Sequence, residues 1–122
     1  MDKQQVLIVD DSDSMRFVIK FCLENAGYQV FEARDGREGL IMAQSKHYDV
    51  IITDINMPNM DGYDFIAQTR KASKNQHVPI LTLTTNTSVK SIAKGKAAGA
   101  TGWLVKPFDD QSLLEVMRKV SS

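Results

Sequence analysis

The stretch Tyr48–Gly62, which reads YDVIITDINMPNMDG, decides the fold of this chain. Its first half is an apolar run containing Val50, Ile51 and Ile52, and such a run is typical of a strand buried on both faces of a parallel sheet. The run ends at Asp54, and turn-forming residues follow it. The stretch therefore predicts a carboxylate at the carboxyl end of a central strand, where open α/β sheets bind their ligands.

Strand-like and helix-like segments alternate along the whole chain. Apolar runs predict strands at Gln5–Val9, Tyr28–Ala33, the run ending at Asp54, Val78–Thr84 and Thr101–Val105. Helices are predicted before Gly27, after a capping-box pair at Asp35 and Glu38, over Asp61–Ala72, over Ser88–Ala98, and after a cap at Asp109. The alternation, with short connections, predicts a single α/β domain over residues 1–122, doubly wound, with five parallel strands flanked by five helices.

The first predicted helix carries an apolar stripe with helical spacing. Its members are Met15, Val18, Ile19, Cys22, Leu23 and Ala26. We expect this stripe to face the core, with the cysteine acting there as a small buried hydrophobe.

Composition excludes several classes of function. The 122 residues are 43% hydrophobic and 25% charged, with a formal net charge of zero, so we expect no broad surface for nucleic acid. A single cysteine allows no internal disulfide, and no paired Cys or His spacing predicts zinc. There is no signal pattern and no apolar run long enough to span a membrane, so we expect a cytoplasmic protein.

Groups suited to phosphate chemistry stand at the carboxyl ends of four of the five predicted strands. They are Asp10 and Asp11, Asp54, Thr84 and Lys106. Because the carboxyl ends of parallel strands share one edge of the sheet, we expect these groups to meet. The three carboxylates would repel one another, and a hard divalent cation such as Mg²⁺ would relieve that repulsion. The lysine and the hydroxyl would then stabilise phosphoryl oxygens beside the metal.

In these residues the chain resembles the receiver domains of two-component response regulators, and among them the single-domain, CheY-like chemotaxis regulators. The resemblance extends over the whole chain. It rests on Asp10 and Asp11 with Met15 and Arg16, on Asp54 in DINMPNMDG, on Thr84, and on Lys106 in GWLVKPF. It implies a flavodoxin-like sheet with strand order 2-1-3-4-5 and a cis peptide bond between Lys106 and Pro107.

The resemblance also implies how the acidic residues act. Asp54 corresponds to the phosphoacceptor, and Asp11 and Asp54 correspond to direct Mg²⁺ ligands. Asp10 would bind the ion mostly through water, and the backbone carbonyl of Asn56 would be a further ligand. Lys106 corresponds to the lysine that binds the phosphoryl group. The protein would thus catalyse its own phosphorylation and dephosphorylation without being a conventional enzyme.

A switch and a set of partners are implied as well. Thr84 corresponds to the switch hydroxyl, and Trp103 stands where the family usually has a switch tyrosine, phenylalanine or histidine. A packing role for Trp103 is an equal alternative, because an indole needs more space to rotate inward. A CheA-like histidine kinase would be the phosphodonor, and a downstream protein, such as the flagellar motor switch, would be the target. We expect a monomer that binds neither nucleic acid nor membrane.

Other functions remain open at this point. Within the family, the chain could be a phosphate sink or a phosphorelay intermediate. An adaptor that has lost phosphorylation is disfavoured by the intact acidic set. A dehalogenase-like hydrolase with an aspartate nucleophile requires a second aspartate two residues later, and Asn56 at that position cannot transfer the proton.

Overall fold

The computed structural model describes residues 3–121. A single parallel sheet has the strand order β2-β1-β3-β4-β5, so both the predicted fold class and the predicted order are confirmed. The strands are β1 (Gln5–Val9), β2 (Gln29–Ala33), β3 (Val50–Asp54), β4 (Ile80–Thr84) and β5 (Gly102–Val105). The helices are α1 (Asp13–Asn25), α2 (Gly36–Ser45), α3 (Gly62–Ala72), α4 (Val89–Ala98) and α5 (Asp110–Ser121).

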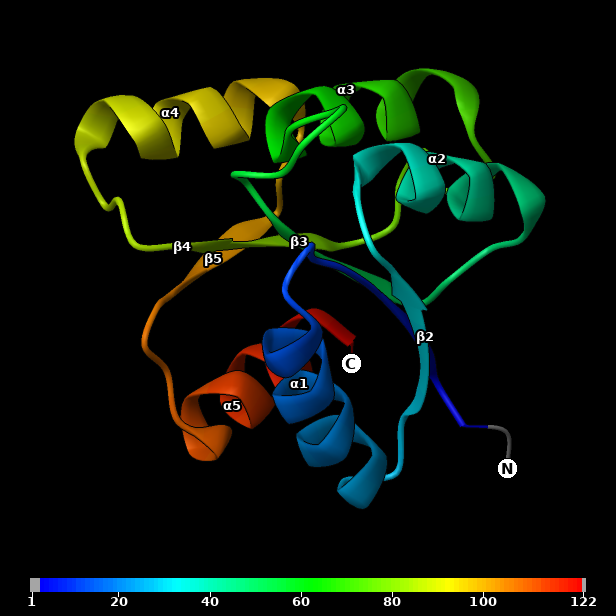
Figure 1. Cartoon of the computed structure of the whole chain (residues 1–122), viewed down its shortest axis with the longest axis vertical. Helices are drawn as coiled ribbons and strands as arrows, with labels where there is room; N and C mark the ends of the chain where they lie inside the picture. Colours follow the sequence, from blue (N-terminus) through cyan, green and yellow to red (C-terminus); the bar gives the residue numbers. More distant parts are fainter. Residues whose placement is uncertain (1–2, 122) are drawn as a thin grey trace.

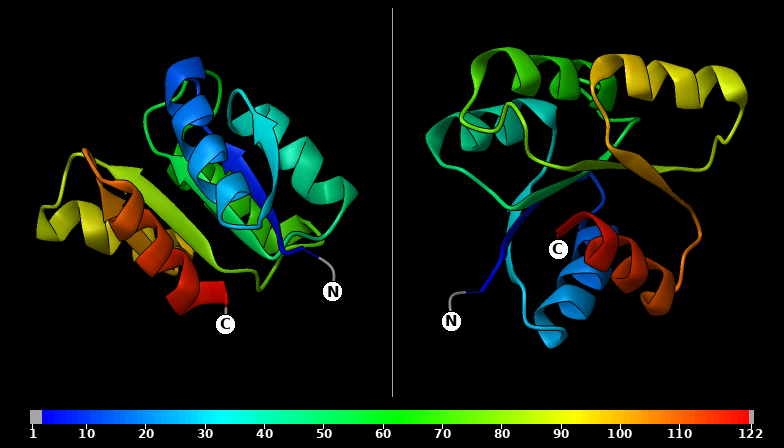
Figure 2. Two further views of the ribbon diagram at one scale, coloured as in Figure 1. Left: turned by 90° about the horizontal axis from the view of Figure 1, so that it is seen from below. Right: turned by 180° about the vertical axis from the view of Figure 1, so that it is seen from behind.

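The helices form a layer on each face of the sheet. Helices α1 and α5 cover one face, and α2, α3 and α4 cover the other, as Figures 1 and 2 show from several sides. Alternate residues of β1 serve the two layers: Val6 and Ile8 join the core beneath α1 and α5, and Leu7 and Val9 join the core beneath α2 and α3. The central strands are therefore rigid supports for whatever side chains follow them.

Capping side chains start the helices close to the carboxyl edge of the sheet. Asp35 Oδ1 accepts a hydrogen bond from Glu38 N (2.9 Å), and Asp109 Oδ1 accepts one from Ser112 N (2.8 Å), as the sequence predicted. Ser12 caps α1 in the same way, through Met15 N (3.2 Å). Each of these caps satisfies a backbone N–H group in the first turn of its helix.

The buried face of α1 differs from the predicted stripe. Ile19, Cys22 and Leu23 are buried as expected, but Val18 is 49% exposed, and Ala26 is an exposed residue beyond the helix end. The physical reason is that a helix buries only a narrow stripe, and Val18 lies about 100° around the helix from Ile19. Phe17 and Phe21 are more exposed still, and their rings stack with centroids 6.2 Å apart.

The Lys106–Pro107 peptide bond is cis, as the resemblance implied. Within residues 3–121, no helix has both the length and the apolar character that crossing a membrane requires.

Candidate functional site

The carboxyl edge of the sheet brings three carboxylates and a lysine together. Ligand oxygens of Asp10, Asp11 and Asp54 all lie within 4.8 Å of one another. Lys106 Nζ lies 3.2 Å from Asp54 Oδ1 and 3.9 Å from Asp10 Oδ2, so its stronger contact is with Asp54. The predicted meeting of these side chains at one edge is therefore confirmed.

Asp10 is the buried member of the acidic cluster. Its side chain is 1% exposed, its Oδ1 accepts a hydrogen bond from Ser12 N (2.9 Å), and its backbone N donates to Ala33 O (3.1 Å). Burial raises the pKa of Asp10, and the nearby charge of Asp54 acts in the same direction, against the lowering effect of the Ser12 amide. A buried carboxylate held among other carboxylates is a group that a cation would stabilise.

Asp54 ends β3 in a tightly packed turn. Its Oδ1 accepts hydrogen bonds from Ile55 N (2.9 Å) and from Lys106 Nζ (3.2 Å). Gly62 lies directly behind it, where Gly62 N donates to Ile55 O (2.8 Å). A Cβ atom at Gly62 would meet the backbone oxygen of Asp54 at 2.3 Å, so only glycine allows the chain to pass this close to the strand tip.

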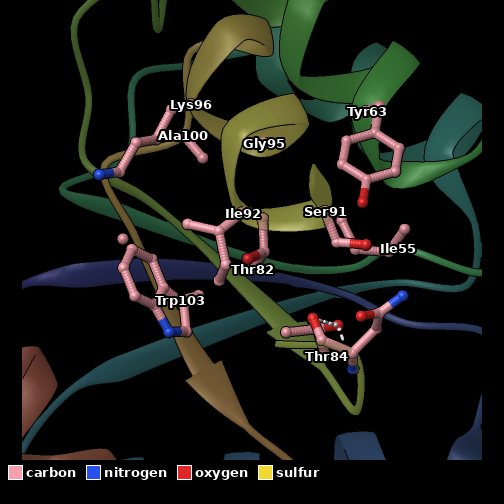
Figure 3. A pocket seen from close by; sticks show the side chains of 12 residues that line it. Ile55, Tyr63, Thr82, Thr84, Ser91, Ile92, Gly95, Lys96, Ala100 and Trp103 are labelled. Atoms are coloured by element: carbon pink, nitrogen blue, oxygen red, sulfur yellow. Dashed lines mark hydrogen bonds between the residues drawn. The ribbon is translucent and has the colours of Figure 1, made fainter. Parts of the chain in front are cut away.

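Thr84 shares a cavity of about 250 Å³ with Asp54, Asn56 and Lys106. Its hydroxyl is already engaged: Oγ1 donates to Asn86 O (3.1 Å) and accepts from Asn86 N (2.9 Å), as the dashed lines in Figure 3 show. Lys106 N also donates to Thr84 O (2.8 Å), which ties the ends of β4 and β5 together. The hydroxyl therefore lies at the site but hydrogen-bonds within its own loop.

Trp103 and Thr84 both line a small pocket beside α4. Trp103 is 40% exposed, and Lys96 Nζ lies 5.5 Å from the centroid of its ring system. The pocket, whose lining includes Ile92 and Gly95 of α4, has a volume of about 10 Å³ (Figure 3). That volume holds about one water molecule, so an indole cannot enter the pocket without movement of α4 or of the loop before it.

The donor set at this edge fits Mg²⁺. It consists of carboxylate oxygens without a cysteine or histidine, which is the chemistry that a hard divalent cation prefers. Asp10 Oδ2 is buried and accepts no hydrogen bond from any residue in the described range 3–121. A buried oxygen of this kind normally has a partner, and a bound cation would supply it.

One buried residue beside the site received no role from the sequence. Arg16 lies on the inward face of α1, where its guanidinium donates to the backbone carbonyl of Asp10. The sequence did contain a signal for its burial: Arg16 has helical spacing from Ile19 and Leu23, and so lies on a face of the helix that is otherwise apolar. The exposed histidines, His47 and His77, line a separate depression with residues that precede β3 and β4, away from the acidic cluster.

Comparison with known proteins agrees with this geometry. The model of a family described as response regulator receiver domain matches residues 6–118. The chemotaxis protein CheY of Pseudomonas aeruginosa is 38% identical, over 95% of this chain and 94% of that protein. The crystal structure of Vibrio cholerae chemotaxis protein CheY4 superposes with a TM-score of 0.93 at 49% identity, covering 98% of this chain and 99% of that one. The receiver domain of the Pseudomonas aeruginosa histidine kinase PA1611, solved with a magnesium ion in its active-site cleft, gives a TM-score of 0.90 at 29% identity and covers 98% of both chains.

Proposed function

The chain belongs to the response regulator receiver domain family, and we propose that it accepts a phosphoryl group on Asp54 and signals through phosphorylation-dependent protein binding. One observation carries this proposal. The carboxylate of Asp54 stands at the tip of a central strand, 3.2 Å from the ammonium of Lys106 and beside two further carboxylates. One edge of the sheet thus holds three groups that phosphoryl transfer would use. They are a carboxylate oxygen to act as nucleophile, a cation to bind the phosphoryl oxygens, and oxygen donors for a metal ion.

The proposed transfer takes a phosphoryl group from a phosphohistidine. A carboxylate oxygen of Asp54 forms a bond to phosphorus as the bond between phosphorus and the histidine nitrogen breaks, and the electron pair stays on the imidazole, which takes up a proton. Asp10, Asp11 and Asp54 would hold Mg²⁺, with the Asn56 carbonyl as a further ligand, and the bound ion would neutralise charge on the phosphoryl oxygens.

Lys106 would keep its place beside the new phosphoryl group and move its ion pair from the carboxylate to a phosphoryl oxygen. Thr84 would exchange its hydrogen bond to Asn86 O for one to the phosphoryl group, and this exchange would move the loop between β4 and α4. Water would later attack phosphorus and release inorganic phosphate from Asp54, which resets the protein. Output would be a shift in population between two states of the loop and of α4.

Chemotaxis is the process we propose for this receiver. The support comes from relatives named as chemotaxis proteins in Pseudomonas aeruginosa and Vibrio cholerae. A CheA-like histidine kinase would supply the phosphoryl group, and the flagellar motor switch is the proposed target. A pull-down with and without a phosphoryl mimic would test the target.

The assignment of Asp54 has a direct test. Treatment with a small phosphodonor and Mg²⁺ should add the mass of one phosphoryl group to the intact protein. Asp54→Asn should abolish this gain, because it replaces the nucleophilic carboxylate by a neutral amide, and Asp64→Asn, which alters an exposed aspartate in the first turn of α3, should keep it. A gain that survives Asp54→Asn would place the phosphoryl group elsewhere.

A further inference from the structure

Arg16 is a cation buried beside the acidic cluster. It is 7% exposed, and its guanidinium contacts the loop residue directly after β1, the first turn of α1, and β2. Nη1 donates to the backbone carbonyl of Asp10, Nη2 donates to the carboxylate of Asp13, and Nε lies 3.4 Å from Glu32 Oε1. The side chain therefore joins the end of β1 to the first turn of α1 and to β2.

Hydrogen bonds hold Asp10 on each side except the one that faces the cluster. Its backbone N donates to Ala33 O, its Oδ1 accepts from Ser12 N, and its backbone carbonyl accepts from Arg16. Its Oδ2 accepts no hydrogen bond within residues 3–121 and lies 3.9 Å from Lys106 Nζ. With Arg16 bound to its carbonyl, Asp10 keeps one oxygen, Oδ2, that has no hydrogen bond within residues 3–121 and is available to a cation.

The carbonyl that Arg16 holds belongs to the peptide unit between Asp10 and Asp11. Because a peptide unit is planar, fixing the direction of this carbonyl also fixes where the chain continues to the Cα atom of Asp11. The same guanidinium thus places the backbone from which both carboxylates extend. We infer that Arg16 is a positioning residue that sets the geometry with which Asp10 and Asp11 bind Mg²⁺, an inference that rests on the proposed function.

Arg16 acts in this way through its shape rather than through its charge. Its own charge is paired with Asp13 and Glu32, and Lys20 Nζ also lies 3.4 Å from Glu32 Oε2, so positive and negative charges balance locally. A lysine at position 16 would keep the charge, but a single ammonium cannot span the anchors that the planar guanidinium reaches. Arg16→Lys therefore separates geometry from charge.

Titration calorimetry with Mg²⁺ on the full chain tests the inference. Arg16→Lys should raise the Kd for Mg²⁺ about tenfold or more, the usual effect of removing a group that orients metal ligands. The matched control is Arg70→Lys. Arg70 Nε and Nη2 likewise donate to a backbone carbonyl, that of Gly99 (3.0 and 2.8 Å), which precedes β5 at the other end of the sheet. The control should lower the melting temperature and leave the Kd within twofold of wild type.

Phosphorylation by a small phosphodonor gives a second readout. The rate of Arg16→Lys should fall at low Mg²⁺ and recover as Mg²⁺ is raised. If Arg16→Lys does not fold, Asp13→Ala and Glu32→Ala serve instead, since each removes an anchor of the guanidinium and should raise the Kd severalfold. A folded Arg16→Lys with a Kd within twofold of wild type, or two anchor variants with unchanged Kd, would overturn the inference. A wild-type chain that binds no Mg²⁺ would instead overturn the proposed function itself.

Discussion

The carboxylate of Asp10 is the group in the site that most needs a partner of opposite charge. The residue is buried, its Oδ2 accepts no hydrogen bond from residues 3–121, and Lys106, which forms an ion pair with its carboxylate, lies closer to Asp54. Without a metal, the chain therefore folds against the cost of a buried and poorly satisfied carboxylate. A cation bound at the cluster would remove that cost, so Asp10 would couple the stability of the fold to metal binding.

Asp10→Asn should stabilise the metal-free protein at neutral pH. The amide removes one charge from the cluster, and its N–H groups can donate to the neighbouring carboxylates. We expect a gain of about 1 kcal/mol or more, the cost of one unsatisfied buried polar atom, and thus a rise of about 4 °C in melting temperature. Thermal denaturation in the presence of a chelator measures it. Asp64→Asn should give no such rise, and an Asp10→Asn protein no more stable than wild type would show that the carboxylate is tolerated without cost.

Among the five helices, α4 buries the fewest side chains against the sheet. Gly95 is its only buried residue, whereas α1 buries Ile19, Cys22 and Leu23 as well as Arg16. A glycine in a helix interior lowers the stability of the helix. The first turn of α4, which Ser88 caps, also has no acidic residue to interact with the helix dipole. The helix is thus suited to be the part that changes when the loop after Thr84 moves.

Gly95→Ala should stiffen α4. A Cβ atom at this position would lie 3.9 Å from Ala100 Cβ and 3.9 Å from Tyr63 Cε1, so it fits without strain. We expect a gain of up to about 1 kcal/mol and slower amide hydrogen exchange over residues 88–98. The reciprocal variant, Ala97→Gly, should speed exchange in the same helix. If residues 88–98 of the wild type already exchange as slowly as the core of α1, and phosphorylation leaves that rate unchanged, α4 is not a labile switch.

Most of the fold, and the meeting of the acidic residues at one edge of the sheet, could be predicted from the sequence. Each apolar run can be recognised locally, and Asp10, Asp54 and Lys106 come directly at or after the ends of three of them. Because the carboxyl ends of parallel strands lie at one edge of the sheet, these side chains are predicted to cluster there. The burial of Arg16 and the exposure of Val18 depend on how α1 docks against the sheet. They could not be predicted from the period of one helix, because that period leaves its rotation about the axis undetermined.

Mg²⁺ should stabilise the whole fold through the acidic cluster. The free energy of unfolding should rise as RT ln(1 + [Mg²⁺]/Kd), which is about 2.7 kcal/mol at a hundredfold excess over Kd. Asp11→Ala should abolish this rise, since it removes the most exposed of the three carboxylates proposed to hold the ion, and Glu115→Ala on α5 should keep it. Melting temperatures across a Mg²⁺ series measure the effect. An undiminished rise in Asp11→Ala would mean that the ion binds elsewhere.

The close passage of Gly62 behind Asp54 has a consequence for genetics. Any side chain at position 62 would press on the backbone of the strand tip, although Gly62 has no group that can take part in phosphoryl transfer. A screen for alleles that abolish signalling should therefore recover substitutions at Gly62 alongside those at Asp54, with the same phenotype. Cellular abundance would separate the two classes, because only the Gly62 alleles should lower the amount of folded protein.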